Sequence, residues 1–374
     1  MTAQRLARPA LLPQPGADHR AARELARQHA PDASAEDYDT EFRSAWKRFA
    51  DFGVFTLAIP EESLDPEAVL GTLEGLGEGT RNAGFLLSVG AHCFAVGSSI
   101  SRFGSEGQRP ILNHLRDGSL IAAFAASEPD AGSDVMSLRT RCTAVGNDYV
   151  LNGTKHFITN AGLADCFLIL ATKDPRLNWR GVTAFLVPRD TPGLSVSAEQ
   201  RLIGYTGCSM GTVHLDSATV PGSARLGRLG QGSSVFRHAM IWERGLLSAM
   251  SLGTMRRQVD DLIRPATKAD HLVSVRSVVD IVSRYLIGRL LVRDTVTKLA
   301  ADALTPAEAS LTKLWVSEAE LATSRDLAGI DPMVTPGIGS ARTDDLVHAL
   351  GGTIYSGTSD IQRRIIAAEI GIVE

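Results

Sequence analysis

One acidic residue interrupts the apolar face of a helix-forming segment in the last third of the chain. In FRHAMIWERGLLSAM, successive +4 and +3 steps fall on Phe236, Met240, Glu243, Leu247 and Met250. Residues at this spacing share one face of an α-helix, so the Glu243 carboxyl is predicted to point into the interior. Because burial disfavours the charged form, it raises the pKa of a carboxyl, which suits a general base.

The same pattern also fits a structural role for Glu243. A buried carboxylate is tolerated when it forms an ion pair, here with Arg244 or with a residue of the next helix. The spacing alone leaves both interpretations open.

Three further segments combine small, hydroxyl and aromatic residues that could contact a cofactor: AASEPDAGSD (125–134), KHFITNAG (155–162) and SGTSDIQR (356–363). The first is a loop whose backbone amides could hold a phosphate or a flavin edge. The second places Phe157 and Thr159 on one face of a strand. The third caps a helix, and helix N-termini favour anions. Each segment also fits an ordinary turn, strand or cap.

Hydrophobic periodicity divides the chain into parts that would position these residues. Residues 17–117 have helical spacing, 118–226 contain short β-branched and apolar runs separated by turns, and 227–374 return to long helical segments. Residues 1–16, rich in Ala, Pro and Arg, are predicted to be disordered. The sequence therefore predicts an N-terminal helical domain, a middle β-domain and a C-terminal helical bundle.

Local signals add detail to this outline. Asp65 before Pro66 marks one helix start, and a capping box from Thr305 to Glu308 marks another. Residues 83–103 are apolar almost all round, which is typical of a buried helix.

Composition excludes several classes of protein. With 44% hydrophobic and 21% charged residues, the 374-residue chain has the composition of a globular protein with a large core. A formal net charge of -4 without a basic run argues against a nucleic-acid binder. We find no apolar stretch long enough to span a membrane and no secretory signal, so we expect a cytoplasmic protein. The four scattered cysteines predict buried thiols and no metal site: Cys93, Cys142, Cys166 and Cys208.

Taken together and in this order, the motifs resemble the acyl-CoA dehydrogenase superfamily. SEPDAGSD followed by NGTKHFITNAG is similar to the signature of that family's middle domain, and IYSGTSDIQR to its C-terminal signature. The strings GEGTRNAGFLLSVGAHC and MIWERGLLSAM look most like the prolyl-carrier-protein dehydrogenases of pyrrole-containing natural products. The resemblance covers roughly residues 20–372.

The resemblance implies a fold, a cofactor and a set of site residues. The fold would be α+β: an N-terminal helical domain, a β-domain and a C-terminal four-helix bundle, with FAD between the last two. Phe124, Ala126 and Ser127 would lie against the isoalloxazine ring, and Gly132 and Ser133 near the pyrophosphate or the substrate. The remaining cofactor-binding residues would be Phe157, Thr159, Thr358 and Asp360.

The resemblance also implies chemistry. Some family members carry the base at the position of Ser356, and others carry it on a bundle helix, at the position of Glu243. Glu243 would remove the α-proton of a thioester while the β-hydrogen leaves as hydride to the flavin, and we assign Arg244 to substrate binding. The substrate would be an acyl or aminoacyl group on a carrier protein, and the enzyme a homodimer or homotetramer, with no nucleic acid or membrane as partner.

Two elements of the family pattern are missing. An Arg-x-x-Phe-Gly element is absent from RPATKADHLVSVRS (264–277), and a Gln-x-x-Gly-Gly element is replaced by GIDPM (329–333). Both elements hold the adenine and pyrophosphate half of FAD across the dimer in relatives, so we expect weaker FAD binding here. The alternatives are non-redox carbanion chemistry, such as elimination or ring closure, and a catalytically silent scaffold that binds a carrier protein.

Overall fold

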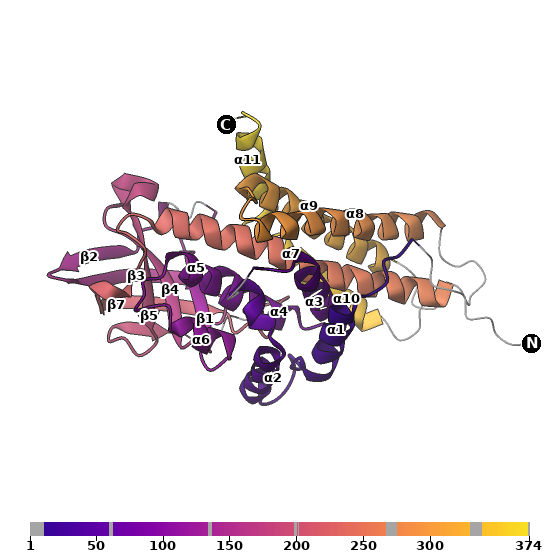
Figure 1. Ribbon diagram of the computed structural model, residues 1–374, viewed down its shortest axis with the longest axis horizontal. Helices are drawn as coiled ribbons and strands as arrows, with labels where there is room; N and C mark the ends of the chain where they lie inside the picture. The colour runs from indigo at the N-terminus through magenta and orange to yellow at the C-terminus, as the bar shows by residue number, and fades with distance from the viewer. Residues whose placement is uncertain are drawn as a thin grey trace, which may run out of the picture.

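The computed structural model describes residues 11–59, 63–133, 137–197, 200, 202–266, 275–329 and 339–372. The molecule is elongated, with the β-sheet at one end and the long helices extending to the other (Figure 1). Helices, strands and again helices follow one another along the chain, which confirms the predicted α+β class.

The N-terminal helices begin where the sequence supplies caps. Asp65 accepts a hydrogen bond from the backbone N–H of Glu67 at 3.0 Å, and Pro66 opens the helix, as predicted. The helices are α1 (Ala17–His29), α2 (Tyr38–Phe52), α3 (Pro66–Gly79), α4 (Ala83–Val89), α5 (Ser98–Phe103) and α6 (Ile111–Arg116).

A continuous apolar helix forms the centre of the helical part. It comprises α4, a π-helical segment over Gly90–Gly97 and α5. Among the described residues it is the one helix long and apolar enough to cross a membrane, so the sequence-based statement that no stretch is long enough was wrong. Since 94% of its apolar window is buried inside the protein, it is the core helix predicted for residues 83–103.

The strands form one mixed sheet, in the order β6-β7-β3-β2-β4-β5-β8, with β1 pairing in parallel with β4. Most neighbouring strands are antiparallel. The strands are β1 (Ala122–Ala125), β2 (Arg141–Val145), β3 (Asp148–Ile158), β4 (Cys166–Thr172), β5 (Val182–Pro188), β6 (Leu194–Val196), β7 (Gly211–Pro221) and β8 (Arg225–Leu226).

Strand β4 joins the sheet to the helices because both of its faces are buried. Leu168 and Leu170 belong to the large core shared with the helices, whereas Phe167 and Ile169 belong to a second core made by the strands. A continuous apolar run such as CFLILAT is typical of a strand covered on both faces. Because β4 is held on both faces, it fixes the position of β1, its parallel neighbour. The position of β1 in turn fixes where the following loop begins.

The C-terminal helices are α7 (Gly232–Ala266), α8 (Val275–Ala300), α9 (Pro306–Ala328), α10 (Gly339–Gly352) and α11 (Ser359–Glu369). The capping box predicted at Thr305 and Glu308 is present. Helix α7 runs along the molecule and packs on α3, α9 and β5 (Figure 1). It approaches α3 so closely that a Cβ on Gly77 would lie 1.9 Å from the Met250 carbonyl oxygen.

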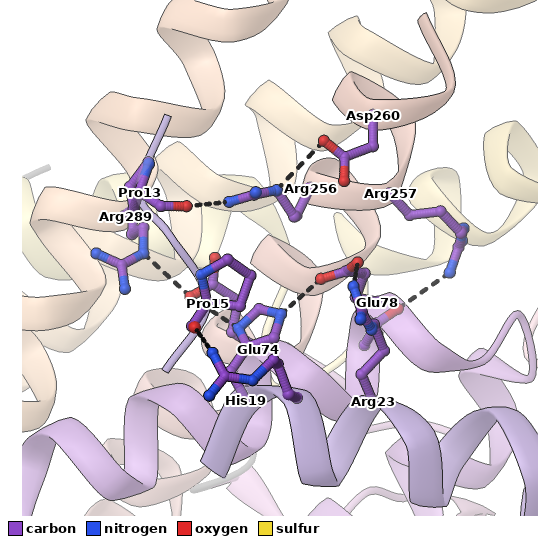
Figure 2. A network of polar contacts seen from close by, with 12 residues as sticks. Pro13, Pro15, His19, Arg23, Glu74, Glu78, Arg256, Arg257, Asp260 and Arg289 are labelled. Carbon is purple, nitrogen blue, oxygen red and sulfur yellow. Dashed lines mark hydrogen bonds and ion pairs between the residues drawn. The ribbon is translucent and has the colours of Figure 1, made fainter. Parts of the chain in front are cut away.

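A buried polar cluster ties α1 to α3 and to the bundle (Figure 2). The His19 ring lies 2.5 Å from Glu78 Oε2, and Glu74 accepts hydrogen bonds from Tyr285 at 2.5 Å and from Arg289 at 3.0 Å. Burial lowers the pKa of His19, but the hydrogen bonds and charges of the two glutamates outweigh it, so the pKa is raised. The cluster fixes the N-terminal helices against the long helices of the C-terminal part.

Candidate active site

The Glu243 carboxyl lies inside the protein, on the apolar face of α7. Glu243 is 8% exposed, and its neighbours on the same helix face, Met240, Leu247 and Met250, are buried. Its hydrogen-bond partner is Ser356, whose hydroxyl donates to Oε1 over 2.5 Å. Among the described residues Glu243 forms no salt bridge, so the alternative of a buried ion pair is not supported.

The surroundings of Glu243 tune its proton affinity. Burial raises the pKa of the carboxyl, and this effect outweighs the hydrogen bond from Ser356 and the positive charges of Arg244 and Lys313, which lower it. A carboxyl with a raised pKa is a stronger base once it is ionised. These surroundings favour the proton-accepting role that the sequence predicts for Glu243.

Ser356 lies in a strained turn that precedes α11. Its φ is 51°, in the left-handed region, and Gly357 follows with a φ of 94°. Non-glycine residues adopt this conformation at a cost of about 1–3 kcal/mol, and such strain gathers at functional sites. Three buried side chains, Arg244, Lys313 and Gln362, hold the turn by donating to its carbonyl oxygens at 2.8–3.2 Å.

Arg244 and Lys313 place two basic side chains near the Glu243 carboxyl. Arg244 donates from Nε to the Ser356 carbonyl at 2.9 Å and from Nη1 to Ser310 Oγ at 3.2 Å. Burial lowers the pKa of Arg244 to about 10. For Lys313, burial and the charge of Arg244 lower the pKa to about 7. The Nε of Arg244 thus holds the turn that carries Ser356. The predicted role of Arg244 in substrate binding stays a prediction.

The loop after β1 is anchored by a buried ion pair. Lys155 is fully buried and contacts Glu128 Oε1 at 2.8 Å and the Ala126 carbonyl at 3.1 Å. Glu128 also accepts the backbone N–H groups of Arg139 and Thr140. A paired and fully hydrogen-bonded charge of this kind holds the backbone of the loop in one conformation.

Two aromatic rings connect strand β1 to α7, the helix that carries Glu243. Phe124 on β1 stacks on Phe236 of α7, with ring centroids 6.2 Å apart and planes inclined by 21°. Phe236 lies seven residues, two helical turns, before Glu243. Strand β1 is therefore in contact with the same helix that carries Glu243.

At the end of β3, Phe157 is a strained and uncovered aromatic residue. Its φ is 55°, and the residue is 59% exposed although neighbouring Ile158 is buried. A bulky residue with positive φ is an outlier, and an uncovered ring at such a position indicates a surface shaped to be covered by another molecule. Thr159 follows and is half-buried.

Comparisons with known proteins identify the family. Residues 123–218 match the middle domain of acyl-CoA dehydrogenases, and residues 230–371 match the C-terminal domain. The L-prolyl-[peptidyl-carrier protein] dehydrogenase of a Serratia species is 34% identical, covering 80% of this chain and 80% of its own. The chain belongs to the acyl-CoA dehydrogenase family.

Solved structures agree with this assignment to the acyl-CoA dehydrogenases. The prolyl acyl carrier protein oxidase AnaB has a TM-score of 0.86 at 31% identity, covering 95% of this chain and 99% of its own. PigA with FAD and proline has a TM-score of 0.84 at 29% identity, covering 96% and 98% of the two chains. The predicted resemblance and the predicted α+β architecture are thus confirmed.

The structure brings together the two positions at which the resemblance predicts a base. These are positions 243 and 356, and their side chains meet at 2.5 Å. A carboxyl from either position would therefore reach the same place. These two positions are 113 residues apart in the chain. Their side chains meet because α7 packs against the turn before α11.

The residues described fit an FAD ring. The exposed, strained face of Phe157 and the half-buried Thr159 lie at the end of β3, and the Ser127 carbonyl accepts the His156 N–H next to them at 2.9 Å. Ala126 is buried, and Ser127 is half-buried. A planar apolar surface bordered by hydroxyl and backbone groups matches the chemistry of an isoalloxazine ring.

The remaining predicted cofactor residues lie on the loop after β1 and at the start of α11. Gly132 and Ser133 are exposed on the loop after β1, and a Cβ on Gly132 would meet no atom within 4 Å. Thr358 caps α11 by accepting the Ile361 N–H, and Asp360 is exposed and pairs with Arg363 at 3.2 Å. The two elements missing from the family pattern fall mostly on residues 267–274 and 330–338, outside the described residues.

Lys313 was missed from the sequence, although the signal is present. On α9 the +4 and +3 steps from Ala309 fall on Lys313, Val316 and Glu320, all of them buried. This is the pattern that selects Glu243 on α7. Applied to α9, it would have found two charged residues on an interior face.

Proposed function

We propose that the protein is an FAD-dependent dehydrogenase or oxidase that acts on an acyl or aminoacyl thioester, with Glu243 as the general base. The observation that carries the proposal is the buried Glu243 carboxyl, held by Ser356 at the point where the two base positions of the family meet. The exposed ring of Phe157 and the likeness to carrier-protein dehydrogenases support it.

In this proposal each residue of the site has a separate role. A thioester acidifies its α-hydrogen, and Glu243 accepts that proton while Ser356 holds one carboxyl oxygen in place. Arg244 and Lys313 fix the turn that carries Ser356. Bound FAD supplies the oxidant that takes up the β-hydrogen as hydride, and Phe124, Ser127, Phe157 and Thr159 would hold its ring.

The substrate in this proposal is attached to a carrier protein, as in the relatives whose names state that substrate. Carrier proteins are typically acidic, so we expect affinity to fall with rising salt. The test is to compare turnover of the same acyl group on a carrier protein and on free coenzyme A. Equal turnover of the two would contradict the carrier requirement.

We further propose that the chain assembles into a dimer or tetramer in the cytoplasm. Helices α8 and α9 expose a set of apolar side chains on their outer faces, here called the α8–α9 patch: Ile287, Leu290, Leu311 and Trp315. Large apolar side chains left exposed on neighbouring helices are candidates for an interaction site. The four cysteines are free and buried, as a reducing compartment permits.

The experiment combines an absorbance spectrum with intact-mass analysis of a prolyl carrier protein after incubation. The proposal predicts flavin bands and the loss of two hydrogen atoms from the acyl group. Exchange of the α-proton in deuterated water without oxidation would instead favour non-redox carbanion chemistry. Carrier binding with neither exchange nor oxidation would favour the silent scaffold.

Flavin binding has its own test, which needs no turnover. Phe157→Ala should weaken FAD affinity, measured by flavin fluorescence, and leave the unfolding temperature of the FAD-free protein almost unchanged, because the ring is mostly uncovered. Trp179, which is 53% exposed on the β-domain, provides a matched control, Trp179→Ala. Equal FAD affinity of both variants would contradict the assignment of Phe157 to the flavin.

A further inference from the structure

Two loops are in contact where α7 begins beside the sheet (Figure 1). The first contains a 3₁₀ helix, η4 (Pro175–Gly181), and connects β4 to β5, whereas the second connects β8 to α7. A Cβ on Gly230 in the second loop would lie 3.1 Å from the carbonyl oxygen of Arg180 in the first. Residues 173–181 and 225–231 are here called the η4 rim.

The η4 rim exposes three large apolar side chains. Leu177, Trp179 and Leu229 are between 39% and 53% exposed. Asn178, which precedes the tryptophan, has a φ of 48°, a conformation that residues other than glycine rarely adopt. Backbone strain of this kind gathers at binding sites. An exposed tryptophan on a strained loop therefore suggests a surface that another molecule covers.

The charge of the η4 rim is positive, although the whole chain carries a formal net charge of -4. The rim has five basic residues and one acidic residue, Asp174, which pairs with Arg176 at 2.8 Å. Arg180 and Arg228 are exposed and form no salt bridge among the described residues. The guanidinium of Arg180 lies 5.0 Å from the centroid of the Trp179 ring, in a cation–π contact.

This uncompensated charge distinguishes the η4 rim from the outer surface of the long helices. There Arg284 pairs with Asp326 and Arg293 pairs with Glu67, each at 2.6 Å. Tryptophan and arginine are enriched among the residues that dominate the affinity of protein–protein interfaces. Unpaired positive charge attracts an acidic partner and accelerates its association. The η4 rim therefore fits a protein with a negatively charged surface, as carrier proteins typically have.

The distance from the η4 rim to Glu243 also suits a carrier protein. Helix α7 begins at Gly232, and Glu243 follows eleven residues later, ~16 Å along the helix axis. A carrier presents its acyl group at the end of a phosphopantetheine arm. The arm has about fifteen bonds in a row, as many as about five extended residues, and so reaches ~17 Å. The arm is therefore long enough to bring a thioester from the rim to the base.

We propose that the η4 rim is the docking surface for the acidic carrier protein whose thioester reaches Glu243. Trp179 supplies the apolar contact, and Arg180 and Arg228 face carboxylates of the carrier. The inference rests on the proposed function, because it locates the surface that binds the partner of that same site. The rim acts on carrier affinity and not on the proton transfer itself.

The first test measures binding without turnover. A fluorescently labelled peptidyl carrier protein that bears phosphopantetheine but no acyl group is titrated with the protein at two salt concentrations. Trp179→Ala should raise Kd by at least ~10-fold, and Arg180→Glu and Arg228→Glu by at least ~5-fold each, with a weaker salt dependence. The matched control is Arg43→Glu, the same charge reversal at an exposed arginine of α2, which should bind like wild type.

The second test separates docking from chemistry. The same acyl group is offered on the carrier protein and on free pantetheine, which has most of the arm but no protein. The ratio of kcat/KM on the carrier to kcat/KM on pantetheine should fall by at least ~5-fold in each rim variant, because only the carrier contacts the rim. In Arg43→Glu the ratio should equal that of wild type.

The two tests together distinguish failure of the inference from failure of the proposed function. Wild-type Kd values and ratios in the rim variants, in a protein that oxidises the thioesters, would overturn the inference and leave the function intact. Carrier binding that the rim variants weaken, in a protein that oxidises neither thioester, would support the inference and overturn the proposed function.

Discussion

Replacing Glu243 by glutamine removes the proton acceptor and preserves the shape of the side chain. Glutamine Oε1 still accepts the hydrogen bond that Ser356 makes at 2.5 Å, so the strained turn keeps its support from α7. General-base catalysis typically contributes ~10²–10⁴-fold, which corresponds to about 3–5 kcal/mol of activation free energy. Turnover should fall by that factor, while FAD binding persists because the predicted cofactor contacts lie elsewhere.

The stability of the Glu243→Gln variant follows from the sign of the pKa shift. Burial raises the pKa of Glu243 in the folded protein, so the folded state holds the proton more tightly than the unfolded state. Protonated Glu243 therefore stabilises the folded wild-type protein at low pH. This stabilisation is lost as the pH rises through the folded-state pKa. Relative to wild type, the variant should be equally or more stable at pH 8 and should lose that advantage as the pH falls toward 4.

The assay is single-turnover oxidation of a carrier-bound acyl group followed by intact mass, with urea unfolding at both pH values. Glu318→Gln serves as control, because Glu318 is a partly exposed glutamate away from the turn. A folded Glu243→Gln protein with near-normal turnover would refute the assignment of the base. An unfolded variant would show that Glu243 is structural.

The contact between Glu243 and Ser356 suggests that a carboxyl placed at position 356 can replace the one at position 243. Ser356→Ala should have a modest effect, because a hydroxyl does not abstract an α-proton unaided. In the double variant Glu243→Gln with Ser356→Glu, a carboxyl returns to the same place from the other position, and partial recovery of turnover is expected. Recovery is limited by alignment, since errors of about 1 Å cost ~10²-fold.

Three further outcomes follow from the contacts described. Lys155→Met leaves the Glu128 carboxylate buried without its cation and should lower the free energy of unfolding by about 3–5 kcal/mol, with weaker FAD binding measured on the same sample. His19→Gln should destabilise the protein at pH 6 by about 2 kcal/mol and progressively less as the pH rises through the raised pKa of His19; a pH-independent loss in urea titrations would contradict this. Leu290→Arg, in the α8–α9 patch, should reduce the mass measured by light scattering, and an unchanged mass would exclude the patch as a subunit interface.

Local sequence signals determined much of the fold. Asp65 and the Thr305–Glu308 capping box begin helices where their side chains satisfy backbone N–H groups that a helix leaves unpaired. The burial of Glu243 followed from helical spacing alone, because residues at +3 and +4 steps must share a face. These features depend on neighbours a few residues away, so the chain specifies them without reference to the rest of the fold.

Only the tertiary structure decided how the site is assembled. The contact between Glu243 and Ser356 and the two basic side chains that hold the turn join α7, α9 and the segment before α11. Only the tertiary structure shows which partner the Glu243 carboxyl takes, because Arg244 follows Glu243 in sequence yet turns its guanidinium to Ser356 and Ser310. Helix packing sets these distances, and neither propensity nor spacing within one helix carries information about which side chain another helix brings opposite it.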